Sequence, residues 1–291
     1  MELGRIGVWA SGPWRARDRS SEAAEVASEL EALGYGTLWM SGGFRGPIDE
    51  MFRPLLEATT KMTVASGIAS IWHTPAEEAS ATFSEFEDRY PGRFLLGLGA
   101  SHQVFVEGSG QAYLHPYRHM AEYLDALDTK APAVPRQRRI LAALGPRMLE
   151  LARARTAGAH SYFVPVEHTA MARSILGAQA LLAPEQAVVV ETDPEIARGV
   201  AREHLAVYLA LPNYTNNLRR LGFSEADIEP PGTDSTVDRL VAWGDAATIA
   251  SRVGSHFDAG ADHVCLQVLT ADSKRFARTE YAALAAALIR Q

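Results

Sequence analysis

The sequence has one cysteine, Cys265, among its 291 residues. A single cysteine cannot form an internal disulfide, which fits a reducing compartment. No apolar run approaches the roughly 18 residues that a membrane-spanning helix needs. The first residues, MELGRIGVWAS, also show no basic segment followed by an apolar leader. We therefore expect a cytoplasmic protein that has no membrane partner.

The sequence also has fewer positively charged than negatively charged residues. Lysine and arginine number 28 against 35 acidic residues, which gives a net charge of −7 and an isoelectric point near 5.7. The basic residues are scattered along the chain and do not form the stripe that a nucleic-acid backbone requires. We expect no nucleic-acid partner. Apolar residues make up 47% of the chain, enough for a full globular core.

Short β-rich runs alternate with amphipathic stretches, a pattern that favours βα units around a parallel sheet. Eight such units can be counted, and a chain of this length can form one α/β barrel. We therefore predict a single (β/α)₈ TIM-barrel domain over residues 1–291. Its strands are expected at residues 5–9, 37–41, 63–69, 94–98, 139–144, 160–164, 187–191 and 263–268.

Three helix starts carry recognisable caps. Thr74-Pro75-Ala76-Glu77 has the spacing of a capping box, with proline at the first helical position. Asp193, which precedes Pro194, and Asp245 are the other expected N-caps. The helices that they begin should pack outside the barrel.

Two long connections interrupt this alternation. About seventy residues separate the last two expected strands, too many for one crossover helix. We therefore expect a helical insertion between strands seven and eight over residues 211–243, broken at Pro230-Pro231-Gly232. A second long loop is expected over residues 108–118, after strand four. In a barrel, the loops after strands seven and eight lie over the mouth, where active sites are found.

The ends of the expected strands are poor in acids. Glu191 is the one carboxylate there, whereas a glycoside hydrolase needs two. His115 and His119 have the spacing of a helical ligand pair, but a zinc site needs at least three protein ligands, so we expect no metal. The turn around Gly97 and Gly99 lacks the third glycine of a dinucleotide-binding fingerprint.

What the strand ends offer instead is small residues and aromatics. Such a surface suits a large planar cofactor better than acid–base chemistry by side chains. Packing explains the tryptophans equally well, and turns explain the glycines. The residues concerned are Trp9, Trp14, Trp39, Gly42, Gly43, Gly67, Trp72, Gly97, Gly99 and Gly145.

The segment LAALGPR, residues 141–147, is more specific. Strand five ends there in small residues and meets Pro146 at a helix start. Free N–H groups at that start would point toward the mouth, where they and the helix dipole can bind a phosphate. An ordinary βα turn presents the same donors, so both interpretations stay open.

Several segments together resemble the luciferase-like monooxygenase group, and more closely its deazaflavin-dependent branch. They are LGYGTLW at 33–39, PGRFLLGLG at 91–99, AALGP at 142–146, GDA at 244–246 and AGAD at 259–262. The resemblance implies that coenzyme F420, or alternatively FMN, lies across the mouth, with its ring backed by strand three and its phosphate near the turn after strand five. It also implies a non-prolyl cis peptide at Gly67–Ile68 and a homodimer.

Carried onto this sequence, the resemblance assigns residues to two groups. The expected substrate contacts are Trp72, Asn213 and Tyr214, although Asn213 could equally be a helix N-cap. The expected cofactor-binding residues are Gly42, Gly43, Gly67, Ile68, Gly99, Ala143, Leu144, Gly145 and Pro146.

One departure from the branch concerns the proton donor. Deazaflavin-dependent members commonly carry an acidic residue and a histidine just after strand two, where this sequence has Gly42 and Gly43. His102, after strand four, is the nearest substitute, because a histidine can exchange a proton near neutral pH. The alternative is that His102 caps a turn. Glu191 and His160 are minor candidates with an expected structural role.

The sequence leaves three candidate functions open. The first is an oxidoreductase that transfers a hydride between bound deazaflavin and a small organic substrate. The second is an FMN-dependent monooxygenase that uses oxygen in the same barrel. The third is a non-catalytic flavin-binding or assembly protein, because a fold does not fix a function.

Overall fold

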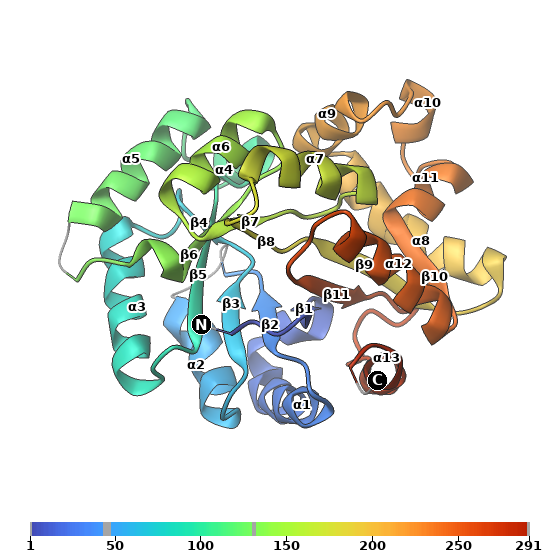
Figure 1. The fold of residues 1–291 in the computed structure, drawn as a ribbon, viewed down its shortest axis with the longest axis horizontal. Coiled ribbons are helices and arrows are strands. Elements are labelled where there is room, and N and C mark those ends of the chain that lie inside the picture. The colour runs from blue at the N-terminus through green and yellow to red at the C-terminus, as the bar shows by residue number, and fades with distance from the viewer. Residues whose placement is uncertain (1, 43–47, 130–131, 290–291) are drawn as a thin grey trace.

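A computed structural model describes residues 2–42, 48–129 and 132–289. Its strands form one mostly parallel sheet, around which the helices are arranged (Figure 1). The strands are β1 (Ile6–Ala10), β2 (Thr37–Met40), β3 (Thr63–Ser66), β4 (Ala69–Ser70), β5 (Phe94–Gly99), β6 (Arg139–Ala142), β7 (Gly158–His160), β8 (Leu181–Leu182), β9 (Glu185–Val190), β10 (Val241–Gly244) and β11 (Val264–Val268).

Helices connect most of these strands in chain order. They are α1 (Ser20–Leu33), α2 (Ile48–Ala58), α3 (Ala76–Arg89), α4 (Gln103–Gly108), α5 (Pro116–Thr129), α6 (Pro146–Arg155), α7 (Val166–Leu176), α8 (Pro194–Leu209), α9 (Pro212–Arg220), α10 (Glu225–Ile228), α11 (Asp234–Leu240), α12 (Ala246–Asp258) and α13 (Arg278–Leu288). Short 3₁₀ helices lie at Gly12–Arg15, Arg17–Arg19 and Arg136–Arg138.

The predicted (β/α)₈ barrel is confirmed. Neighbouring strands follow the order β11, β1, β2, β3, β5, β6, β7 and β8. The segment that joins β8 to β9 closes the sheet by hydrogen bonding on both sides. On one side Ala183 N donates to Ala159 O, and on the other Cys265 N donates to Pro184 O. Strand β10 pairs with β9 as an extra strand.

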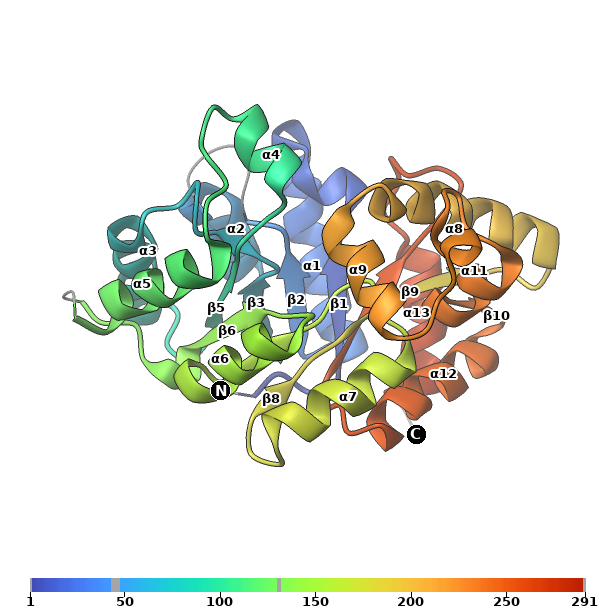
Figure 2. The ribbon, with the colours of Figure 1, turned by 90° about the horizontal axis from the view of Figure 1, so that it is seen from above.

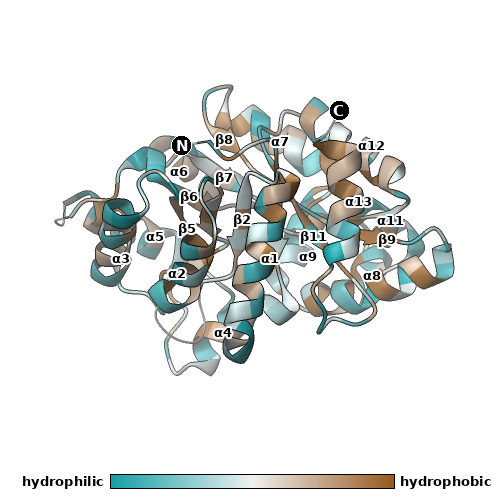
Figure 3. Ribbon diagram, turned by 90° about the horizontal axis from the view of Figure 1, so that it is seen from below, coloured by the Kyte–Doolittle hydropathy of each residue, from teal (hydrophilic) through white to brown (hydrophobic). Residues whose placement is uncertain are grey.

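Side chains of the strands alternate between two parts of the core. Leu38 and Met40 join the cluster between the strands and the helices. Trp39, between them, belongs to a second cluster inside the barrel, together with Trp9 and Cys265. This is the two-residue period of a strand. Hydrophobic residues accordingly concentrate on the strands and on the helix faces turned toward them (Figure 3).

Some predicted bounds are wrong. The strand expected at 160–164 is β7, which ends at His160, because Phe163 adopts a left-handed conformation with φ 57° and cannot continue a strand. The expected strand 63–69 is split into β3 and β4. The predicted cis peptide at Gly67–Ile68 lies between them and is confirmed.

Two of the three expected helix N-caps are confirmed. Asp193 accepts hydrogen bonds from the first turn of α8, and Asp245 accepts one from Thr248 N at the start of α12, as predicted. The capping box at Thr74 is wrong, because the N-cap of α3 is Pro75 and makes no side-chain bond. The buried face of α3, which includes Ala79, Phe83 and Phe86, is as expected.

The insertion is confirmed as helical. Helices α9, α10 and α11 occupy most of it, and its break coincides with a cis peptide at Pro230–Pro231. Strand β10, at its end, was not predicted. The other long loop is shorter than expected, since Gly108 ends α4 and Pro116 begins α5. Helix α4 and the loop that follows it project beyond their neighbours at the top of Figure 2. Within the described residues, we find no helix long and apolar enough to cross a membrane.

Candidate functional site

The carboxyl ends of the strands are lined by half-buried residues. Gly67 follows β3, Ala100 follows β5, Ala142 ends β6 and Tyr162 follows β7. These residues therefore surround a partly accessible mouth of the barrel. Residues 43–47 fall outside the described ranges, so the predicted contact of Gly43 is not placed.

Three of the predicted site residues meet at one side of this mouth. The Nδ2 atom of Asn213 lies 3.2 Å from Ser101 O and 3.3 Å from Nδ1 of His102. The ring of Tyr214 lies 5.1 Å from the His102 ring, centroid to centroid. Asn213 and Tyr214, both from α9 of the insertion, thus contact His102, which follows the end of β5.

The structure also bears on the alternative structural roles of His102 and Asn213. His102 is the N-cap of α4, but its side chain makes no capping hydrogen bond. Asn213 is not an N-cap, because that position of α9 is Leu211 and Pro212 follows it. Burial lowers the pKa of His102 to about 4, so its ring is neutral at pH 7. The role of His102 in proton exchange stays a prediction.

Trp72 belongs to the same cluster. Its Nε1 donates to Ala100 O at 2.8 Å, and its ring stacks on His119 with centroids 4.2 Å apart. Tyr113, from the loop after α4, packs against Trp72 and lies 3.4 Å from Ser101 O. His119 is half-buried where it stacks on Trp72.

Three of the predicted cofactor-binding glycines lie close against neighbouring side chains. A side-chain carbon built at Gly99 would lie 2.5 Å from the side chain of Ile68, so these two predicted residues pack on each other. One built at Gly42 would lie 3.1 Å from Phe52. At Gly67 it would lie 2.9 Å from Nε1 of Trp9. Packing alone thus accounts for glycine at each of these positions.

The start of α6 matches the expectation of a free helix N-terminus. Its N-cap is Gly145, which has no side chain to bond the first N–H groups, and Pro146 follows. A side-chain carbon built at Gly145 would lie 3.9 Å from both Nη atoms of Arg220. A guanidinium from the end of α9 therefore faces the N-terminus of α6.

Two buried side chains support this arrangement. Nε2 of His168 lies 2.9 Å from Leu144 O and holds the turn between β6 and α6. Asn217 accepts a hydrogen bond from Arg220 through Oδ1. Its Nδ2 is buried and has no partner among the described residues. The cluster therefore has a cation and free N–H donors, the groups that bind a phosphate.

Aromatic side chains fill the other half of the mouth. The rings of Trp9 and Tyr162 lie 4.9 Å apart. The Tyr162 hydroxyl lies 2.7 Å from Oε1 of Gln267 and 2.8 Å from the hydroxyl of Tyr208 on α8. Helix α8, which precedes the insertion, is thus joined to the barrel by a partly buried polar contact.

A buried acid, Glu185, lies beneath these rings. Its Oε2 accepts from Phe163 N at 3.1 Å, and its Oε1 has no partner among the described residues. Burial raises the pKa of Glu185 to about 8, against the opposing effect of that hydrogen bond. The carboxyl is therefore protonated at neutral pH. By contrast, Glu191 at the strand end accepts hydrogen bonds from the backbone N–H groups of Thr192 and Asp193 in the next turn.

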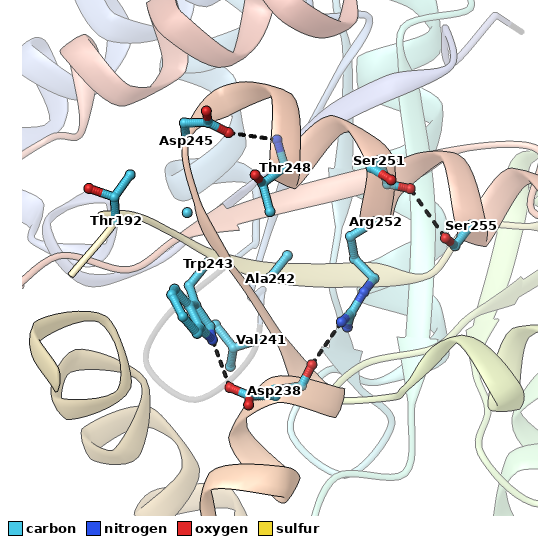
Figure 4. A pocket seen from close by; sticks show the side chains of 11 residues that line it. Thr192, Asp238, Val241, Ala242, Trp243, Asp245, Thr248, Ser251, Arg252 and Ser255 are labelled. Carbon is cyan, nitrogen blue, oxygen red and sulfur yellow. Dashed lines mark hydrogen bonds between the residues drawn. The ribbon is translucent and has the colours of Figure 1, made fainter. Parts of the chain in front are cut away.

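Two cavities lie away from the mouth. One, of about 670 Å³, is bounded by β10 and α12 (Figure 4). Its charged side chains have internal partners, since Asp245 caps α12, Arg252 donates to the carbonyl of Asp238, and the Asp238 carboxylate accepts from Trp243. The other, of about 340 Å³, lies at the opposite end of the barrel beside His263. No group of three metal-ligating side chains occurs within the described ranges.

Residues 1–263 match the luciferase-like monooxygenase family. The chain belongs to this family. A comparison with curated proteins finds no match. The match to the luciferase-like monooxygenase family agrees with the resemblance that the sequence motifs show.

Solved structures share the fold of this luciferase-like protein. An F420-dependent secondary alcohol dehydrogenase, in complex with an F420–acetone adduct, superposes with a TM-score of 0.76 at 15% identity, over 99% of this chain and 98% of that chain. The coenzyme F420-dependent tetrahydromethanopterin reductase from Methanopyrus kandleri gives 0.77 at 12% identity, over 99% of each chain.

An FMN-containing structure is similar as well. The oxygenating constituent of 3,6-diketocamphane monooxygenase from Pseudomonas putida, a type II Baeyer–Villiger monooxygenase in complex with FMN, gives a TM-score of 0.70 at 12% identity, over 98% of each chain. At these identities the likeness concerns the fold.

Sequence reasoning missed two residues of this region, Arg220 and Glu185, whereas Asn217 was expected to contact the substrate from the insertion. Arg220 lies about 75 residues from the turn that it faces, and no local spacing connects it to that turn. Glu185 was missed because the expected strand began at residue 187. The one available signal was an arginine at the end of a helix in the insertion that was expected to cover the mouth.

Proposed function

We propose that this luciferase-like protein is an oxidoreductase that transfers a hydride between bound coenzyme F420 and a small organic substrate. When bound, the deazaflavin supplies or accepts the hydride, and the substrate gains or loses a proton as well. The chain itself contributes binding, orientation and exclusion of water. The observation that carries the proposal is Arg220 facing the uncapped N-terminus of α6.

The residues present fit the phosphate of such a cofactor. The backbone N–H of Arg147 in the first turn of α6, the guanidinium of Arg220 and the Nδ2 of Asn217, which has no partner among the described residues, are all donors. Two of the three come from α9, which also carries Asn213 at its other end. One helix of the insertion would thus serve both the cofactor phosphate and the side of the mouth near His102.

The same donors fit FMN, which also carries a phosphate. An FMN-dependent monooxygenase is therefore the second candidate, and the similarity to an FMN-containing monooxygenase structure supports it. A non-catalytic flavin-binding or assembly protein is the third, because the histidine and acid that are common after strand two in the deazaflavin branch are replaced here by glycines. We further propose a homodimer, which size-exclusion chromatography tests.

The test is a titration of the purified protein with coenzyme F420 and, separately, with FMN, followed by fluorescence. We expect F420 to bind at least about tenfold more tightly. Arg220→Ala should weaken its binding by about 10- to 100-fold, the effect of losing a charge-assisted contact. Arg219→Ala is the matched control, since Arg219 pairs with Glu225 on the surface.

Each other outcome has a definite meaning. Tighter binding of FMN would favour the monooxygenase. Binding of neither cofactor would favour the non-catalytic alternative. Equal loss of affinity in the Arg219 and Arg220 variants would contradict the phosphate site at α6.

A further inference from the structure

The amide of Asn213 has one possible orientation. Its Nδ2 lies within hydrogen-bonding distance of Ser101 O, a carbonyl oxygen that can only accept. The atom facing Ser101 must therefore be the NH₂ group. The same group lies 3.3 Å from Nδ1 of His102, which makes Nδ1 the acceptor of that contact.

The backbone around Ser101 supports this geometry. Ser101 has a left-handed conformation, φ 58°, which few residues other than glycine adopt. Its carbonyl is approached by Asn213 and also by the hydroxyl of Tyr113. The turn thus presents a carbonyl and the His102 ring to one amide.

We propose that Asn213 is a positioning residue that fixes His102 as the Nε2–H tautomer. An imidazole whose Nδ1 accepts a hydrogen bond carries its proton on Nε2. His102 is then a hydrogen-bond donor through Nε2. It does not act as a base through Nδ1, because the lone pair of that atom is engaged.

The surroundings of His102 favour this uncharged ring. The titratable side chain packed against it is Tyr214 of α9, and Tyr113 lies on the other side of Asn213. Burial raises the pKa of both tyrosines, so both are neutral. Phe105 of α4 is the remaining ring contact.

The consequence for reaction chemistry rests on the proposed function. When a carbonyl carbon gains a hydride, its oxygen gains negative charge and is then protonated from solvent. A fixed N–H donor stabilises that charge. The tautomer itself can be measured without any cofactor or substrate, so its test is independent of the proposed function.

The experiment is NMR of the protein labelled with ¹⁵N-histidine, with His102→Gln used to assign the signals. We expect wild-type His102 to have a protonated Nε2 and an unprotonated Nδ1. Asn213→Asp keeps the shape but replaces the donor by an acceptor, so the proton should move to Nδ1 and the ring should titrate at higher pH. Asn213→Ala should give a mixture of tautomers.

The matched control is Asn216→Ala, an exposed asparagine on the same helix whose Oδ1 contacts Arg219. It should leave the His102 signals unchanged. A mixed tautomer in the wild type would overturn the proposal, as would an unchanged His102 spectrum in Asn213→Asp. Circular dichroism verifies that each variant is folded; because Asn213 is exposed, we expect all of them to fold.

Discussion

The indole Nε1 of Trp39 donates a hydrogen bond to Nε2 of His263 inside the barrel, at 3.0 Å. Nδ1 of His263 lies 2.8 Å from Gly4 O and donates to it, so both ring nitrogens are paired. Burial lowers the pKa of His263 to about 4, which keeps the ring neutral. Trp9, also in the barrel, differs because its Nε1 has no partner among the described residues.

We predict that Trp39→Phe lowers the free energy of unfolding more than Trp9→Phe does. Both changes remove similar packing volume, but only the first leaves a buried acceptor, Nε2 of His263, unpaired. The difference should be about 1–3 kcal/mol. Urea unfolding followed by circular dichroism measures it, and equal losses in the two variants would contradict the prediction.

Glu185 should make stability fall as the pH rises. Its pKa is raised from 4.5 to about 8 by burial, so between these values the folded protein holds a proton that the unfolded chain releases. The contribution is complete below pH 4.5 and is lost as the pH rises to 8. We expect Glu185→Gln to be more stable than wild type at pH 8, by about 2 kcal/mol or more.

The measurement for Glu185 is urea unfolding at pH 5 and pH 8. Glu203→Gln, which removes the same charge from an exposed position of α8, is the control and should not change the pH dependence. A Glu185→Gln variant with the wild-type pH dependence would show that the carboxyl is ionised in the folded protein.

Glu31 should have the opposite effect. Partial burial raises its pKa, but hydrogen bonds from Lys61, Met62 and Thr60 outweigh this and lower it to about 2. Its contribution is present above pH 4.5 and is lost as the pH falls toward 2. Glu31→Gln should cost about 1–2 kcal/mol at pH 7, reduced by solvent screening, and much less at pH 2.5. Thermal unfolding at the two pH values tests this, and a pH-independent cost would refute it.

Gly67 should not tolerate a side chain. A carbon built there lies 2.9 Å from Nε1 of Trp9, so alanine forces the Trp9 ring to move, whereas its distance of 3.6 Å from Nε2 of His160 is an ordinary contact. We expect a loss of about 1–3 kcal/mol and a change in tryptophan fluorescence. Gly199→Ala is the control, because that helical glycine has nothing within 4 Å, and it should stabilise by about 1 kcal/mol. A stable Gly67→Ala variant with wild-type fluorescence would contradict this packing.

The fold could be predicted because its signals are local. Alternating strands and helices, aspartate caps such as Asp193 and Asp245, and the proline-marked break in the insertion each act over a few residues. The predicted strand at residues 160–164 was wrong because its residues make tertiary contacts that the local pattern does not show. Strand β7 ends at His160 because the chain turns at Phe163 to donate to Glu185.

The candidate site was predicted in part. His102, Asn213 and Tyr214 were all named from the sequence, and the structure brings them together. Their contact joins positions about 110 residues apart, and only the docking of α9 over the mouth creates it. The same docking places Arg220 beside Gly145, a contact that no local spacing in the sequence indicated.

By itself, the sequence determined the barrel, the insertion and the small-residue turn that begins α6, because periodicity, caps and backbone conformation depend on near neighbours. Only the tertiary structure determined which titratable side chains are uncharged at pH 7 and which distant residues are in contact. Those properties depend on burial and on long-range approach: His102 and Glu185 are ordinary titratable residues in the sequence, and their surroundings in the fold remove their charge at pH 7.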